Sequence, residues 1–167
     1  LLQRRYVVLI PVIALMALTR PSGLAFALAL CLHAVHRFIT RARDPFPLWE
    51  RILLIGVMVF SGIMGLAWPF RAWMATGSLS AYTDTELAWR APYLGYRELI
   101  PFTPWVQGAE FWMPGPIGII VLVIVVVGFF AFLFTPWARR LGVTLRIWVA
   151  SYGLYLLAVF FPQSSTF

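Results

Sequence analysis

The chain has 167 residues, of which 62% are hydrophobic and only 11% are charged. A soluble domain carries about 25% charged residues, so this chain has too little polar surface to cover a water-exposed globule. The formal net charge is +7, and all thirteen basic residues are arginines. Because these arginines cluster between apolar runs, we expect them to orient the chain in a bilayer rather than to bind nucleic acid. Composition therefore predicts an all-α, polytopic integral membrane protein.

The start of the chain predicts a fragment rather than a whole protein. Residue 1 is Leu1, not an initiator methionine, and the chain stops soon after an apolar run. Arg4 and Arg5 before an apolar stretch imitate a signal peptide, but Arg20 follows without a small-residue cleavage site. The one cysteine, Cys31, lies inside an apolar run and excludes an intramolecular disulfide. We expect residues 1–167 to be a single membrane domain cut from a longer protein.

The first two apolar runs are each short for a bilayer span, which needs about 20 residues. Together they are too long for one span, so we expect two short helices over 4–19 and 22–38, joined by a tight turn at 19–23. Pro21 and Gly23 suit such a turn, and Ser22 can cap the second helix. A single helix kinked at Pro21 is the alternative.

A polar connector over 37–51 leads to a third span over 52–73, which we expect Pro69 to break near its end. Residues 77–115 then form the one long hydrophilic excursion. Within it, Thr83 and Glu86 have capping-box spacing, which predicts a short amphipathic helix ending before Pro92. The prolines of the remaining excursion predict an irregular segment against the membrane surface.

The fourth span, 117–134, has eighteen residues without a charge, and the fifth covers 145–161. Five spans alternate between two sides, so the arginines divide between those sides. Four arginines fall on the side of the 77–115 excursion. The opposite side holds nine: Arg4, Arg5, Arg37, Arg41, Arg43, Arg51, Arg139, Arg140 and Arg146. Positive loops favour the cytoplasm, so the nine-arginine side is predicted to be cytoplasmic and 77–115 extracytoplasmic in a plasma membrane.

This topology gathers most outward polar groups at one membrane boundary and predicts a substrate-binding pocket there. Arginine forks match phosphate oxygens, and carboxylates bind sugar hydroxyls or act as bases. The blander alternatives are interfacial anchoring for the arginines and helix capping for the carboxylates. The candidates are Arg20, Arg71, Asp84, Glu86, Arg90, Gln163 and Ser164.

Other signals are weaker. His33 and His36 have i, i+3 spacing, but no acidic or cysteine residue is near in sequence, so no metal site is expected. Gly62 and Gly65 are expected to permit close helix packing. Nucleotide-binding glycine loops, CxxC pairs, GxSxG elbows and HExxH motifs are absent from the sequence.

The stretch ALTRPSGL at 17–24 resembles the arginine-containing turn of PIG-V-type mannosyltransferases and their actinobacterial relatives. Further similar stretches, in chain order, are Trp68-Pro69, AYTDTELAWR at 81–90, PFTPW at 101–105 and YLLAVFFPQSSTF at 155–167. The all-arginine basic set also suits a bacterium with GC-rich DNA.

The resemblance implies the GT-C architecture, with a glycosyltransferase site on the extracytoplasmic face. The implied donor is a polyprenyl-phosphate sugar, with mannose expected, and the acceptor is a lipid or glycan. The catalytic carboxylate of such enzymes lies in a first outer loop, which would precede Leu1 here, so no catalytic residue is assigned within this chain. No cofactor is implied.

Two other functions stay open. A non-catalytic protein for lipid or glycolipid binding or transport would distribute polar residues through its spans. A structural membrane protein, whose arginines only set topology, would tolerate Arg20→Ala.

Overall fold

The computed structural model describes residues 6–19, 22–94 and 100–159. All regular structure in these ranges is helical, which confirms the all-α prediction. The nine helices within the described ranges are α1 (Tyr6–Thr19), α2 (Gly23–Ile39), α3 (Leu48–Gly65), α4 (Ala67–Thr76), α5 (Ala81–Leu94), α6 (Thr103–Trp112), α7 (Pro116–Phe132), α8 (Pro136–Arg139) and α9 (Val143–Val159).

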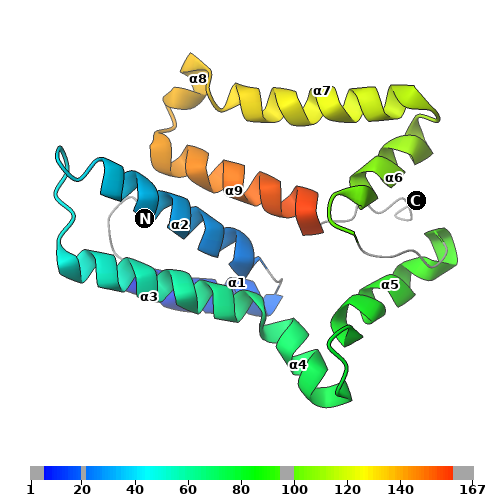
Figure 1. The fold of residues 1–167 in the computed structure, drawn as a ribbon, viewed down its shortest axis with the longest axis horizontal. Helices are drawn as coiled ribbons and strands as arrows, with labels where there is room; N and C mark the ends of the chain where they lie inside the picture. Colours follow the sequence, from blue (N-terminus) through cyan, green and yellow to red (C-terminus); the bar gives the residue numbers. More distant parts are fainter. Residues whose placement is uncertain (1–5, 20–21, 95–99, 160–167) are drawn as a thin grey trace.

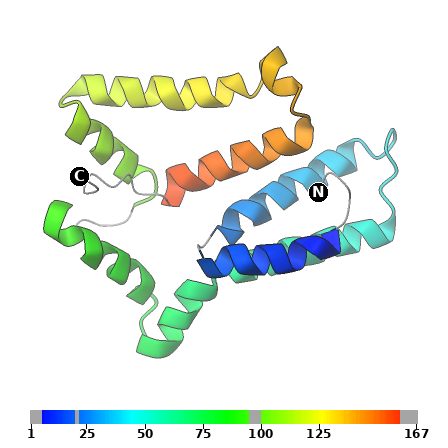
Figure 2. The same ribbon diagram turned by 180° about the vertical axis from the view of Figure 1, so that it is seen from behind.

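The five long apolar helices lie roughly along one axis, and each runs antiparallel to the one before it in the chain (Figure 1). They are α1, α2, α3, α7 and α9. Helix α2 packs between α3 and α9, and α1 lies against α3, as the reverse view also shows (Figure 2). The connector between α2 and α3 and the short helix α8 lie at one end of this bundle. Helices α4, α5 and α6 lie toward the other end. We call these the connector end and the α4–α6 end.

Helix length distinguishes α3 from the other apolar helices. By length and composition, α3 is the one helix in the described ranges that is long and apolar enough to cross a membrane. The apolar helices α1, α2, α7 and α9 have 14 to 17 residues. Five membrane spans thus stay a prediction.

Two antiparallel helices replace the alternative of one kinked helix at the start of the chain. Helix α1 ends at Thr19 and α2 begins at Gly23, close to the predicted bounds. Residues 20–21 lie outside the described ranges. Ser22 occupies the N-cap position, but its side chain makes no capping hydrogen bond, because its backbone is already in the helical region (φ −77°, ψ −3°). The prediction of a Ser22 cap was wrong.

A contact between small residues joins the start of α2 to the end of α3. A Cβ added at Gly65 would lie 2.6 Å from the backbone nitrogen of Leu24, and one added at Gly23 would lie 2.7 Å from that of Gly65. Ser61 Oγ donates a hydrogen bond to the carbonyl of Gly23, at 2.8 Å. The packing role predicted for Gly65 is confirmed. That of Gly62 was wrong, because an added Cβ there meets no atom within 4 Å.

The third predicted span is two helices with a break earlier than expected. Helix α3 ends at Gly65, and α4 begins at Ala67, two residues before Pro69. Pro69 therefore sits in the first turn of α4, where backbone N–H groups have no partner inside the helix and proline is tolerated. The proline begins a second helix here instead of ending the first.

The excursion is more helical than its prolines predicted. Helix α5 starts at Ala81, ahead of Thr83, and continues through Pro92 to Leu94, so both the capping box and the stop before Pro92 were wrong. Thr83 Oγ1 instead donates to the carbonyl of Ser80, at 2.7 Å. The prediction of an irregular segment was also wrong, because residues 103–112 form helix α6. Pro104 lies in the first turn of this helix, where proline is accepted.

The fourth and fifth predicted spans form helices near their expected bounds. Helix α7 begins at Pro116, and the described part of α9 ends at Val159. Between them, the Thr135 side chain caps α8 by accepting a hydrogen bond from the backbone of Ala138, at 3.3 Å. Large apolar side chains of α7 such as Ile120, Ile124 and Val127 are exposed over more than half of their surface. A helix of this kind suits a lipid environment better than water.

Candidate functional site

The residues on either side of Arg20 make defined contacts, while Arg20 itself lies outside the described residues. On one flank, Trp68 Nε1 of α4 donates a hydrogen bond to the carbonyl of Leu18, at 3.1 Å. On the other flank, Ser61 holds the carbonyl of Gly23 at the start of α2. The stretches at 17–24 and 68–69, which are separate in sequence, therefore lie next to each other.

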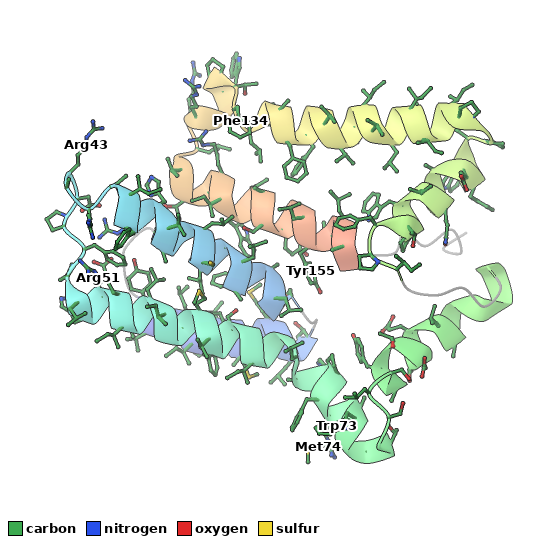
Figure 3. All side chains as sticks on the ribbon, in the orientation of Figure 1. Arg43, Arg51, Trp73, Met74, Phe134 and Tyr155 are labelled. Atoms are coloured by element: carbon green, nitrogen blue, oxygen red, sulfur yellow. The ribbon has the colours of Figure 1, made fainter. Side chains whose placement is uncertain are left out.

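A second tryptophan makes an equivalent connection between α6 and α9. Trp105 Nε1 donates to the carbonyl of Leu156, at 3.0 Å. The indole N–H is a donor without acceptor capacity, so this bond fixes the side on which the ring lies. It joins the stretch at 101–105 to the one that begins at Tyr155. Figure 3 shows Tyr155 near the end of α9, on the side of the α4–α6 end.

The predicted site residues divide into three described and four undescribed ones. Arg71 is an exposed residue of α4, and Asp84 and Glu86 belong to α5, which packs against α4. Their helices lie at the α4–α6 end of the bundle. The side chain of Arg90 is not described, although its helix is. Arg20, Gln163 and Ser164 lie outside the described ranges, so their convergence with the three is untested.

The two carboxylates of α5, Asp84 and Glu86, each interact with a nearby residue of the same segment. Asp84 Oδ2 accepts a hydrogen bond from Ser80 Oγ, at 2.6 Å, in the first turn of α5. A carboxylate in a first turn also faces the positive end of the helix dipole, so Asp84 stabilises the start of α5. Burial, followed by the negative charge of Glu86, raises the pKa of Tyr82 above its ordinary value of 10.0. Tyr82 and Glu86 are thus electrostatic neighbours one helical turn apart.

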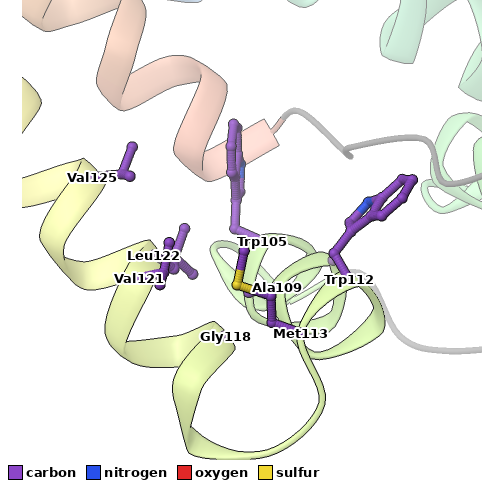
Figure 4. A pocket seen from close by; sticks show the side chains of 9 residues that line it. Trp105, Ala109, Trp112, Met113, Gly118, Val121, Leu122 and Val125 are labelled. Atoms are coloured by element: carbon purple, nitrogen blue, oxygen red, sulfur yellow. The ribbon is translucent and has the colours of Figure 1, made fainter.

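An apolar groove lies between α6 and α7, with a volume of about 240 Å³ (Figure 4). Helix α6 packs so closely on α7 at Gly118 that an added Cβ would collide with the carbonyl of Ala109. No charged side chain lines the groove, so it suits an apolar chain rather than a phosphate or a sugar. The lining residues are Trp105, Gly108, Ala109, Trp112, Met113, Gly118, Val121, Leu122 and Val125.

A buried ionic cluster at the connector end was not predicted. Glu50 at the start of α3 and Arg37 near the end of α2 are only 1% and 4% exposed. Arg37 Nη2 donates to both carboxylate oxygens of Glu50, at 3.2 and 3.1 Å, and Tyr6 Oη donates to Glu50 Oε1, at 2.9 Å. Arg37 also pairs with Asp44 and donates to the carbonyl of Pro45, at 2.9 Å. This pairing compensates the burial of both charges.

His33 belongs to the same cluster. Its Nε2 lies 3.5 Å from Tyr6 Oη, and the residue is 5% exposed. Because Tyr6 gives its one hydroxyl hydrogen to Glu50, the weak contact requires His33 Nε2 to donate. His33 Nδ1 then accepts no hydrogen bond from the part of the chain that the structure describes. No group of three or more metal-ligating side chains forms within those ranges.

The sequence did contain a signal for this cluster. His33 and Arg37 are four residues apart and share one helix face, and a short connector forces the end of α2 to lie near the start of α3. Arg37 lies at one of those ends and Glu50 at the other, so an ion pair can form between α2 and α3.

Comparison with known proteins adds no further assignment: models of protein families, curated proteins and solved structures all yield no match to this chain.

Proposed function

We propose that this chain is the membrane domain of a glycosyltransferase that moves a sugar, with mannose expected, from a polyprenyl-phosphate donor to a lipid or glycan acceptor. Transfer takes place at the α4–α6 end, on the extracytoplasmic side. The chain is oriented by its arginines, with the connector end in the cytoplasm.

The observation that carries this proposal is the meeting of family-like stretches that are distant in sequence. Trp68 contacts the carbonyl of Leu18, and Trp105 contacts that of Leu156. Both contacts lie toward the α4–α6 end, where α4 and α5 also bring Arg71, Asp84 and Glu86. Arginines, carboxylates and aromatic rings at one end of a bundle suit a substrate with a phosphate, a sugar and an apolar tail.

In the proposed reaction, an acceptor hydroxyl attacks the anomeric carbon of the donor sugar and the lipid phosphate leaves. Arg20 stabilises the negative charge that develops on the departing phosphate, a role of the oxyanion-hole type. Arg71 and Arg90 assist, while Gln163 and Ser164 bind sugar or phosphate. The base that accepts the hydroxyl proton is assigned to no residue of this chain.

The decisive experiment replaces Arg20 with lysine and measures sugar transfer from a polyprenyl-phosphate donor in membranes. Lysine keeps the charge but loses the planar fork, so we expect transfer to fall by at least tenfold with normal expression. Gly62→Ala is the control, because it adds a methyl group that meets no atom within 4 Å. Normal transfer by Arg20→Lys would contradict the proposed role of Arg20.

One observation favours the second candidate, a non-catalytic protein for lipid or glycolipid binding or transport. The groove between α6 and α7 has an apolar lining and no carboxylate, so it can hold a lipid chain without any chemistry at the site. This candidate predicts that Arg20→Lys changes lipid binding while no sugar transfer occurs with either the wild type or the variant.

A further inference from the structure

The described arginines of the connector end separate into two groups with different bonding. Three of them are used inside the protein. Arg37 pairs with Glu50 and Asp44, Arg51 Nε donates to the carbonyl of Phe46 at 2.8 Å, and Arg146 Nη1 donates to that of Leu133 at 3.1 Å. These three hold helix ends and loops together.

The other four, Arg41, Arg43, Arg139 and Arg140, are exposed. None of them forms a side-chain hydrogen bond or an ion pair with another residue in the described ranges. Two stack on aromatic rings instead: Arg41 lies 4.3 Å from the centre of the Phe38 ring, and Arg140 lies 4.8 Å from that of Trp137. Stacking orients a guanidinium group while leaving its N–H donors available. Figure 3 shows Arg43 pointing away from the bundle.

No acidic side chain in the described ranges forms an ion pair with these four arginines. Asp44 and Glu50 belong to the same end, and both pair with the internal residue Arg37. Tryptophans flank the free arginines, with Trp49 62% and Trp137 70% exposed. Exposed tryptophan beside arginine is typical of the boundary between lipid tails and headgroups.

We propose that Arg41, Arg43, Arg139 and Arg140 form a binding surface for the phosphate groups of anionic phospholipids in the cytoplasmic leaflet. The charge is complementary, the arginine forks match phosphate oxygens, and exposed tryptophans at the same end are typical of headgroup depth. The connector and α8 each supply one pair, and both elements lie at the same end of the bundle (Figure 1). The inference rests on the membrane placement in the proposed function, but not on sugar transfer.

The experiment measures lipid binding by the purified protein in a neutral detergent, with phosphatidylglycerol, phosphatidylcholine and inorganic phosphate as separate probes. Native mass spectrometry counts the bound lipids. We expect phosphatidylglycerol to bind at least tenfold more tightly than phosphatidylcholine, and inorganic phosphate at equal concentration not to displace it. Replacing all four arginines with glutamine removes that preference. Replacing all four with lysine keeps part of it, because charge remains without the fork.

Arg51→Gln is the matched control, because Arg51 is another arginine of the connector end but its Nε is bonded to the carbonyl of Phe46. It should keep the preference for phosphatidylglycerol. Equal binding of both phospholipids, complete displacement by inorganic phosphate, or equal losses in Arg51→Gln and the fourfold glutamine variant would each overturn the proposal. Sugar transfer measured on the same variants is a separate readout, so failure of lipid binding and failure of the transferase proposal are distinguishable.

Discussion

At the connector end, Arg37 and Glu50 are almost fully buried and are bound to each other, to Tyr6 and to Asp44. At the α4–α6 end, Arg71 is exposed, and Asp84 interacts with a serine of its own helix turn. The first arrangement joins α1, α2 and α3 and leaves little capacity for a ligand. The second keeps its charges at the surface, where a substrate can reach them. Burial and partners thus separate charges that hold the fold from charges that can serve a site.

The largest test of this contrast is Glu50→Leu. It leaves the buried guanidinium of Arg37 with Asp44 as its remaining carboxylate, and we expect the free energy of unfolding to fall by about 3 kcal/mol or more. Denaturant-induced unfolding in detergent, followed by tryptophan fluorescence, measures it. Asp84→Asn is the counterpart at the other end and should cost less than about 1 kcal/mol. Equal losses in both variants would remove the distinction between the ends.

A second prediction concerns the contact between the start of α2 and the end of α3. Gly65→Ala places a Cβ 2.6 Å from the backbone of Leu24, and we expect it to cost about 1–3 kcal/mol because backbone atoms must shift. Gly62→Ala meets no atom within 4 Å and should be neutral or stabilise by up to about 1 kcal/mol. Thermal unfolding of the two variants side by side gives the comparison. If Gly65→Ala is as stable as Gly62→Ala, the close contact does not exist.

Trp68→Phe tests the link between α4 and the end of α1 with a smaller change. Phenylalanine keeps an aromatic ring but loses the N–H that bonds the carbonyl of Leu18, so we expect a loss of about 1 kcal/mol. In the proposed enzyme, it should also lower sugar transfer, because the end of α1, which precedes Arg20, is less firmly held. Trp73→Phe on the same helix is the control, since Trp73 is about as exposed as Trp68 but its indole N–H donates no hydrogen bond to a residue in the described ranges. Similar losses for both tryptophans would argue against a special role for Trp68.

The smallest expected effect is the titration of Tyr82. Its raised pKa means that the folded state holds the phenol proton more tightly than the unfolded state does. The associated stability is present below pH 10 and is lost as the pH rises through the raised pKa. Tyr82→Phe should therefore lose less stability than the wild type at alkaline pH. Glu86→Gln should lower the pKa of Tyr82 part of the way, measured by tyrosinate absorbance; an unchanged pKa would exclude the influence of Glu86.

The positions of the long helices could be predicted from the lengths of the apolar runs and from the helix-breaking residues Pro21 and Gly23. The predictions from prolines and caps were wrong. The sequence pattern predicts helix breaks at Pro69 and Pro104, but a proline in a first turn starts a helix as readily as it ends one. The capping box at Thr83 does not form, because the helix already begins at Ala81 and Thr83 lies inside it. Such choices depend on where neighbouring helices pack, which a local pattern does not contain.

The candidate site was predicted less completely than the fold. Topology predicts Arg71, Asp84 and Glu86 on one side of the membrane, and the structure has them on α4 and α5 at one end of the bundle. Their membrane side and their binding role stay predictions. The hydrogen bonds of Trp68 and Trp105 span 50 and 51 residues, and no local signal specifies such partners. Predicting the ion pair of Arg37 and Glu50 requires charges to be paired between the neighbouring helices α2 and α3 rather than along one helix.

The length of α7 has a consequence for the surrounding lipid. At about 1.5 Å per residue, the 17 residues of α7 extend about 26 Å, whereas the hydrocarbon core of a typical bilayer is about 30 Å thick. In the proposed membrane setting, this mismatch thins the bilayer beside α7 and brings the headgroup layer closer to the groove between α6 and α7. Lipids with shorter acyl chains would remove the mismatch, so acyl-chain length becomes a variable that controls how deeply this groove lies.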